Sequence, residues 1–420
     1  MVLFYFIFVL LMIGYAALIS YYHQGWSRIA EFGTAGKSEV DDGRQTSVSV
    51  IVALRNECHN VPALLDSLKD QDYPRTLTEI ILVDDHSSDD TWALISSYAE
   101  DHFIKAFRLE TFPGRTVSAD TSAADTDADT SAADTSVAFT SIAYKKQAIS
   151  LGIAQAGGEL IVTTDADCTF ERGWLTAITA YYRISGSVFI AAPVRYKMRE
   201  RESARLLSVF ESLDFITLQA ITGASVSRKF HTMCNGANLA YTKAVFGEVD
   251  GFSGIDHIPG GDDMLLMYKV FKKYPDRVSY LKSQQAIVST AGTGSWRSFF
   301  NQRIRWSSKA VHYDDKRVFW ILLMVYLVNC CFLVAAFAAF FKTNYLVFFG
   351  LMLLAKVLIE FPFVNNAAMF FGQQRLMRYF PFMQPFHIVY TIIAGWLGKF
   401  GSYEWKGRKI NNHGNSTQRT

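Results

Sequence analysis

The tetrapeptide TDAD occurs twice in the sequence, and two carboxylates that flank one small residue could hold a divalent metal ion. Carboxylate oxygens are hard ligands that suit Mg²⁺ or Mn²⁺. The copy at 164–167 follows an apolar stretch at 159–163 that has the composition of a β-strand. Ligands of open parallel sheets bind at the carboxyl ends of the strands. This position predicts that the carboxylates of Asp165 and Asp167 project into a ligand-binding crevice.

The other copy lies in the acidic stretch 120–134, DTSAADTDADTSAAD, a near-repeat of ADTSA with five acidic residues and no apolar face. Such a stretch cannot bury enough apolar surface to order itself, so we predict a disordered acidic insertion at 116–140. A calcium loop is the alternative, but the stretch lacks the glycine and the terminal glutamate of an EF-hand loop. The later copy is therefore the predicted site.

Three further short stretches carry groups that could act on a phosphorylated or hydroxylated ligand. These groups are Asp84 and Asp85 in VDDHS, Asp262 and Asp263 in GGDDMLL, and Gln302, Arg305 and Trp306 in NQRIRW. An aspartate can take the proton of an attacking hydroxyl. An arginine can hold a phosphate bidentately, and a tryptophan can stack on a sugar face.

These residues also have structural interpretations. Asp84 and Asp85 could be turn or helix-capping residues, and Asp262 could cap the helix that follows it. Arg305 could be one of the basic residues that flank a membrane span on the cytoplasmic side. Trp306 could belong to the aromatic belt at the membrane interface.

The elements that must position these residues alternate between strands and helices. Strand-like stretches occur in SVSVIVALRN, EIILVDD, IKAFRLE, ELIVTTDAD and SVFIAAPV, and helix-like stretches follow at 61–69, 91–100, 145–155 and 174–183. This alternation predicts an α/β fold with a mostly parallel sheet covered by helices on both faces.

Apolar segments flank the predicted α/β domain. Residues 1–22 carry no charge and show neither a basic n-region nor a small-residue cleavage site, so we expect an uncleaved transmembrane anchor. Residues 318–341 and 345–364 are predicted transmembrane helices. The latter carries Lys356 and Glu360, whose spacing allows a mutual pair facing the protein or an interfacial end of a tilted span.

The basic residues near these segments predict their topology. Arg28 follows the anchor and Lys309 and Lys316 precede the next span, which places the catalytic domain in the cytoplasm. The segment 381–400 contains two prolines and is expected to be re-entrant, interfacial or a third C-terminal transmembrane segment. It precedes a basic tail at 401–420, which we expect to be cytoplasmic.

The order of the short stretches (strand-RNE, strand-DD, strand-DAD, GDD, QxxRW) resembles that of the membrane-bound family 2 glycosyltransferases, from about Ser47 to Trp306. This family has the GT-A fold and includes cellulose and hyaluronan synthases and ceramide glucosyltransferase. The resemblance implies an inverting enzyme with a GT-A nucleotide-sugar-binding domain at 47–310. One departure is the Tyr-Lys-Lys at 144–146, where the family often has glycine-lysine, so either lysine could reach the diphosphate or form a solvated helix start.

The resemblance also implies a role for each matching residue. Asp263 is the general base, with Asp262 beside it, and Asp167 binds Mg²⁺ or Mn²⁺ with Asp165 near the nucleotide sugar. The remaining residues are expected to contact the nucleotide, the diphosphate or the acceptor: Ala53, Arg55, Glu57, Asp84, Asp85, Lys145, Lys146, Gln302, Arg305 and Trp306.

Composition narrows the function further. The 420 residues are 50% hydrophobic with a formal net charge of +2, which excludes a disordered chain and gives no support to nucleic-acid binding. Five cysteines do not make a disulfide framework, which fits a reducing compartment. We expect a UDP-sugar donor and a lipid or polysaccharide acceptor in an integral membrane protein. The alternatives are a processive exopolysaccharide synthase, a non-catalytic scaffold and a nucleotidyltransferase.

Overall fold

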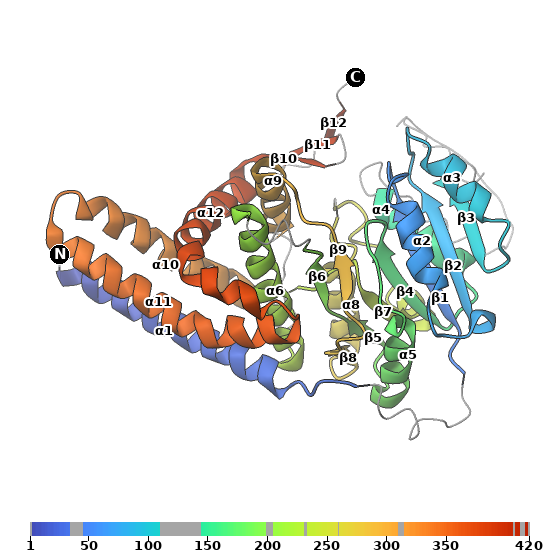
Figure 1. The fold of residues 1–420 in the computed structure, drawn as a ribbon, viewed down its shortest axis with the longest axis horizontal. Coiled ribbons are helices and arrows are strands. Elements are labelled where there is room, and N and C mark those ends of the chain that lie inside the picture. The colour runs from blue at the N-terminus through green and yellow to red at the C-terminus, as the bar shows by residue number, and fades with distance from the viewer. Residues whose placement is uncertain are drawn as a thin grey trace, which may run out of the picture.

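The computed structural model describes residues 2–33, 45–109, 144–198, 205–230, 233–258, 260–309, 315–405, 408–411 and 416–418. The predicted insertion at 116–140 lies outside these residues. The described chain forms a helix bundle that adjoins an α/β sheet (Figure 1). The bundle brings the N-terminal helix, in blue, beside the C-terminal helices, in orange and red.

The sheet of the α/β part has seven strands in the order β3-β2-β1-β4-β7-β5-β8. The strands are β1 (Val48–Leu54), β2 (Thr78–Asp84), β3 (Ile104–Arg108), β4 (Leu160–Asp165), β5 (Phe189–Ala191), β7 (Leu239–Thr242) and β8 (Val278–Tyr280). Strands β1 to β4 are parallel, and β7 runs antiparallel to both β4 and β5. The predicted α/β fold with a mostly parallel sheet is confirmed.

Helices cover both faces of the sheet. Val50 and Val52 of β1 belong to one core with α2 (Val61–Lys69), α3 (Thr91–Tyr98) and α5 (Trp174–Ser185). Ile51, which points to the opposite face, packs with α4 (Tyr144–Gln155) in a core that extends into the helix bundle. Because successive side chains of a strand point to opposite faces, a continuous apolar run suits a strand buried on both sides.

Shorter elements complete the described chain. They are η2 (Arg75–Leu77), β6 (Val194–Tyr196), α7 (Lys243–Glu248), α8 (Met264–Lys273), β9 (Val288–Thr290), η6 (Gln374–Tyr379), β10 (Ser402–Trp405), β11 (Arg408–Asn411) and β12 (Ser416–Gln418). Strands β6 and β9 pair in parallel, and β10 to β12 form an antiparallel sheet within the predicted tail.

Within the described residues, four helices are long and apolar enough to cross a membrane: α1 (Val2–Arg28), α6 (Leu206–Ser227), α10 (Lys316–Ala339) and α11 (Thr343–Phe370). Three of them, α1, α10 and α11, overlap the segments predicted as spans. The fourth, α6, lies between the bundle and the sheet and is mostly buried (Figure 1). The predicted segment 381–400 is the helix α12 (Phe380–Phe400), which packs against α9 (Trp296–Ser307) and α10.

Buried polar side chains tie α11 to α1 and α12. Lys356 and Glu360 form an ion pair within α11, so the spacing-based expectation of a mutual pair is confirmed. Gln384 of α12 donates to Glu360 at 2.8 Å and accepts from Lys356, and Tyr15 of α1 donates to Glu360. These four residues are called the bundle cluster below.

Close contacts at small residues join α1 to α6. A side chain at Gly25 would lie 2.9 Å from the Ala224 carbonyl, and one at Gly223 would lie 2.8 Å from the Trp26 ring. Trp26 is fully buried, and Lys282 lies 4.3 Å from its ring centroid. The last turn of α1 is thus enclosed where the bundle meets the sheet.

Candidate active site

A cavity of about 240 Å³ opens at the carboxyl ends of β1, β2 and β4. Its lining includes all of the predicted site residues except one: Ala53, Arg55, Glu57, Asp85, Lys145, Lys146, Asp165, Asp167, Asp262, Asp263, Gln302, Arg305 and Trp306. Residues separated by up to 253 positions therefore meet in one place. Asp84 is the predicted residue that does not line the cavity.

The end of β4 delivers the two carboxylates of the later TDAD copy. Asp165 pairs in register with Ala53 of the neighbouring strand β1, and Asp167 accepts a hydrogen bond from Thr290 Oγ1 at 3.0 Å. Among the described residues, no group of three or more His, Cys, Asp or Glu side chains converges as a metal site. Two carboxylates with open space beside them nevertheless fit Mg²⁺ or Mn²⁺, because these ions commonly take further oxygen ligands from a substrate phosphate.

Lys145 lies between two of the cavity carboxylates. Its Nζ is 2.8 Å from Asp165 Oδ1 and 3.0 Å from Asp262 Oδ2, and 23% of the side chain is exposed. Burial alone would lower the pKa of Lys145, but the two carboxylates outweigh it and raise the pKa. The ammonium group is thus charged and faces the cavity, where it could meet a diphosphate.

The neighbouring Lys146 is placed differently although it also borders the cavity. The residue is 1% exposed, and its Nζ donates to the carbonyl of Ile258 at 2.9 Å and to the carbonyl of Ile255. Burial lowers the pKa of Lys146 to about 8, against the opposing effect of Asp262. The N–H donors of Lys146 are thus used by the loop that contains Ile255 and Ile258. Of the two lysines, Lys145 is therefore the one whose ammonium group faces the cavity.

The adjacent aspartates 262 and 263 divide their contacts. Asp263 precedes α8 and accepts from the backbone N–H of Met264 at 2.8 Å, so the suggestion that Asp262 caps this helix is wrong. Burial would raise the pKa of Asp262, but Lys145 and Lys309 outweigh it and lower the pKa to about 2. Asp263 lies 3.8 Å from Lys309 and keeps 16% of its side chain exposed.

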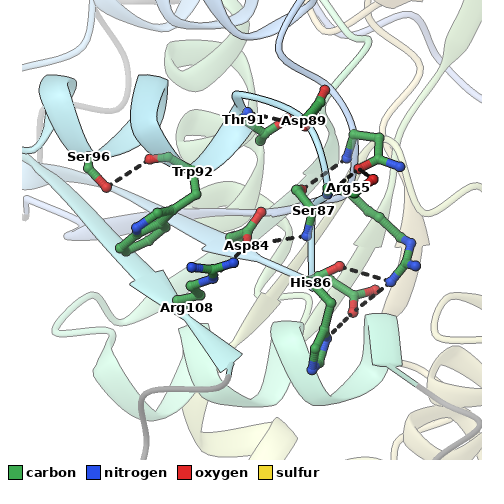
Figure 2. Close-up of polar contacts among 12 residues, drawn as sticks. Arg55, Asp84, His86, Ser87, Asp89, Thr91, Trp92, Ser96 and Arg108 are labelled. Carbon is green, nitrogen blue, oxygen red and sulfur yellow. Dashed lines mark hydrogen bonds and ion pairs between the residues drawn. The ribbon is translucent and has the colours of Figure 1, made fainter.

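Asp84 and Asp85 lie at the end of β2 and point to different surroundings. Asp84 is fully buried and pairs with Arg108 at 3.4 Å, while Arg108 lies over the ring of Trp92 (Figure 2). Asp85 lines the cavity, where its backbone carbonyl accepts from Arg55 at 3.1 Å and its carboxylate lies 3.0 Å from His86 Nδ1. Asp84 is therefore a buried structural residue, whereas Asp85 belongs to the cavity wall.

Helix α9 brings the QxxRW residues to the opposite wall. Trp306 stacks on Phe215 of α6 with ring centroids 6.0 Å apart and lines the cavity together with Gln302 and Arg305. Trp306 is half-buried here and forms part of the cavity wall. Lys309, seven residues after Gln302, lies on the same wall.

Sequence reasoning missed several residues that line the cavity: Tyr144, Tyr196, Asn235, Thr290 and Lys309. The helical spacing of Lys309 from Gln302, Arg305 and Trp306 was a usable signal, since residues three, four and seven apart share one face. For Tyr196 and Asn235, no such pattern marks the sequence, because they reach the cavity through the tertiary fold.

Two family models match the chain. Glycosyl transferase family 2 matches residues 49–119, and Glycosyl transferase family 21 matches residues 136–415. The probable glycosyltransferase YdaM of Bacillus subtilis (strain 168) is 22% identical over 317 residues, which cover 73% of this chain and 64% of that protein. The chain thus matches somewhat less than two thirds of the length of that relative.

Two further glycosyltransferases are similar to the chain. Poly(ribitol-phosphate) β-N-acetylglucosaminyltransferase TarS of Staphylococcus aureus (strain Mu50 / ATCC 700699) is 39% identical over 66 residues, 16% of this chain and 12% of that protein. The mannosyltransferase PcManGT from Pyrobaculum calidifontis, solved with GDP-Man and Mn²⁺, has a TM-score of 0.56 at 17% identity, over 94% of this chain and 98% of its own. That likeness shows a shared fold. Since the family 21 model matches more than half of its length, the chain belongs to glycosyl transferase family 21 and is a glycosyltransferase of the family 2 type.

Proposed function

We propose that the protein is an inverting glycosyltransferase that moves a sugar from a UDP-sugar to a lipid or polysaccharide acceptor at the cytoplasmic face of a membrane. The observation that carries this proposal is the convergence of Asp165, Asp167, Asp263 and the QxxRW residues on one cavity. Membrane-length helices adjoin that cavity through α6 and α9, which supports an acceptor that arrives from the bilayer.

Asp263 is the proposed general base. It would accept the proton of the acceptor hydroxyl while that oxygen bonds to the anomeric carbon and the bond from this carbon to the diphosphate breaks. The electron pair of the broken bond leaves with the nucleoside diphosphate, and one displacement inverts the anomeric centre. Asp262 is a weaker candidate because its low pKa and its contact with Lys145 make it a poor proton acceptor at neutral pH.

The donor would lie over the strand ends. Arg55, Glu57 and Asp85 border the side where we place the nucleoside, and Lys145 and Arg305 would pair with the diphosphate. Asp165 and Asp167 would hold Mg²⁺ or Mn²⁺, which supplies positive charge to the departing diphosphate.

The experiment uses membranes that contain the full chain, with radiolabelled UDP-glucose, UDP-N-acetylglucosamine and GDP-mannose, each with Mn²⁺ or Mg²⁺. Product is partitioned into solvent-extractable and high-molecular-mass fractions. We expect Asp263→Asn to lower the transfer rate by about 10²–10⁴-fold, the usual contribution of a general base. Asp276→Asn is the matched control, because its side chain is 74% exposed on another surface.

The fractions distinguish the possible functions. Extractable label that is lost with Asp263→Asn and with a chelator supports a glycolipid enzyme, whereas high-molecular-mass label with the same losses supports a processive synthase. Label that survives Asp263→Asn would overturn the assignment of the base. Release of sugar 1-phosphate in place of UDP or GDP would identify a nucleotidyltransferase, because transfer of the nucleotidyl group breaks the bond between the two phosphates. The absence of transfer from every donor would favour a scaffold.

A further inference from the structure

The side chain of Gln302 is held in one orientation at the cavity wall. Its amide oxygen accepts from Arg303 Nη1 at 2.6 Å and from the hydroxyl of Tyr196 at 3.0 Å. Since a guanidinium group only donates, the oxygen of the amide must face Arg303. The N–H groups of Gln302 are therefore the part of the amide that can serve a ligand in the cavity.

Arg303 is held in turn by a buried carboxylate. Its Nε donates to Asp214 Oδ2 at 2.8 Å, and its Nη2 lies 2.6 Å from the same oxygen. The guanidinium group also lies 4.6 Å from the ring centroid of Phe299 and 4.3 Å from that of Trp306. With 3% of the residue exposed, Arg303 is fixed on several sides.

The carboxylate of Asp214 links this arrangement to the helix bundle. Its other oxygen, Oδ1, accepts from the hydroxyl of Tyr390 at 2.5 Å. Asp214 lies on α6, Tyr390 on α12 and Arg303 on α9. A continuous chain of hydrogen bonds thus runs from α12 through α6 to the cavity residue Gln302.

We propose that Arg303, Asp214 and Tyr390 are positioning residues, which fix the Gln302 amide so that its N–H groups donate to an oxygen of the bound substrate. This inference rests on the proposed function, because it requires a substrate in the cavity. It extends the catalytic machinery to α12, a helix that contributes no residue to the cavity wall among the described residues. The position of α12 would then bear directly on turnover.

A double-mutant cycle on the solubilised full chain tests the proposal, with transfer from whichever of UDP-glucose, UDP-N-acetylglucosamine and GDP-mannose supports turnover. We expect Gln302→Leu to lower kcat by about a hundredfold, as for the loss of one oriented donor. Gln302→Glu keeps an oxygen for Arg303 but has no N–H donor, so we expect a loss of about the same size. Tyr390→Phe should cost roughly five- to tenfold through misplacement of the amide.

The coupling between the sites separates positioning from mere structural support. In the Gln302→Leu background, we expect Tyr390→Phe to cost less than about twofold, because no amide remains to be oriented. The affinity for the Mn²⁺ complex of the nucleoside diphosphate should be retained in Tyr390→Phe. Tyr345→Phe, which removes a hydroxyl elsewhere in the bundle, is the matched control and should leave kcat unchanged.

Two results would overturn the proposal. One is an equal cost of Tyr390→Phe in both backgrounds, and the other is unaltered kcat in Gln302→Glu. Metal-dependent transfer by the unaltered protein and its loss in Asp263→Asn, measured in parallel, report separately on the proposed function.

Discussion

Two lysine-carboxylate clusters lie in different parts of the molecule. In the cavity, Lys145 Nζ lies 2.8 Å from Asp165 and 3.0 Å from Asp262, and both the lysine and Asp165 keep part of their side chains exposed. In the bundle cluster, Lys356 is fully buried and pairs with Glu360, and Gln384 and Tyr15 supply further hydrogen bonds. The same chemical groups are thus open to a ligand in one cluster and enclosed by helices in the other.

The difference shows how one kind of ion pair can serve binding or architecture. A partly exposed pair such as Lys145 and Asp165 can exchange its partner for a substrate group at lower cost than a buried pair, since water screens the separated charges. A fully buried pair cannot, because breaking it leaves an uncompensated charge. We therefore expect substitutions in the cavity to change activity and substitutions in the bundle cluster to change stability.

The largest expected effect is in the bundle cluster. Lys356→Met should lower the free energy of unfolding by about 3–5 kcal/mol, because Glu360 would remain buried without its cation. The double variant Lys356→Met/Glu360→Leu should lose less than half as much. Thermal unfolding in detergent measures both, and equal losses in the single and double variants would contradict the ion-pair explanation.

A pH dependence sharpens the contrast at Lys146, which borders the cavity but is enclosed like a bundle residue. Its pKa falls from 10.5 to about 8 on folding, so between these values the unfolded chain binds a proton that the folded chain does not. Stability should therefore rise with pH from about 8 to 10.5, by at most about 3 kcal/mol from this group.

Denaturant unfolding at pH 7.5 and pH 10 checks this expectation. Lys146→Met should remove the rise, whereas Lys105→Met on the edge strand β3 should keep it. A rise of the same size in the Lys146→Met variant would show that other groups cause it.

Lys145→Met should change activity rather than stability. We expect transfer to fall by about 10–100-fold, in the range for a lost charged contact to a phosphate, with little change in the thermal midpoint. Of its two partners, Asp165 keeps 38% of its side chain exposed, and the buried Asp262 still has Lys309 nearby. A large fall in the midpoint would place Lys145 with the bundle residues and break the comparison.

The smallest expected effects distinguish two adjacent carboxylates. Asp84→Asn should lower stability by about 1–3 kcal/mol through its buried contact with Arg108, with donor KM unchanged. Asp85→Asn should raise donor KM by roughly tenfold, the scale of one lost hydrogen bond to a charged group, and leave stability unchanged. Reversal of the two outcomes would mean that the nucleoside lies over Asp84.

Much of the fold followed from local patterns in the sequence. The helix expected at 61–69 has those bounds, and the apolar runs before Asp85 and Asp165 are strands that end where the polar residues begin. These predictions succeeded because hydrophobic periodicity and strand-ending polar residues are local signals. The order of the short sequence stretches resembled that of a known family, and this resemblance predicted that residues distant in the sequence share one site.

Other features depended on tertiary contacts that no local pattern encodes. Lys146 differs from Lys145 because it donates to the loop that contains Ile258. Asp263 rather than Asp262 caps the helix because its carboxylate accepts from the backbone N–H of Met264. Likewise, the link from Tyr390 to Asp214 joins residues 176 positions apart. Adjacent like residues are thus the hardest to assign, since the sequence offers the same chemistry at both positions.

The enclosure of Trp26 has a consequence for the order of assembly. The last turn of α1 leaves the ribosome early, but it packs against Gly223, Tyr280 and Phe370, which are made about 200 to 340 residues later. The indole ring of Trp26 can therefore be covered only after most of the chain has been synthesised. The fluorescence of Trp26 would then report one of the final steps of biogenesis, when the bundle and the sheet come together.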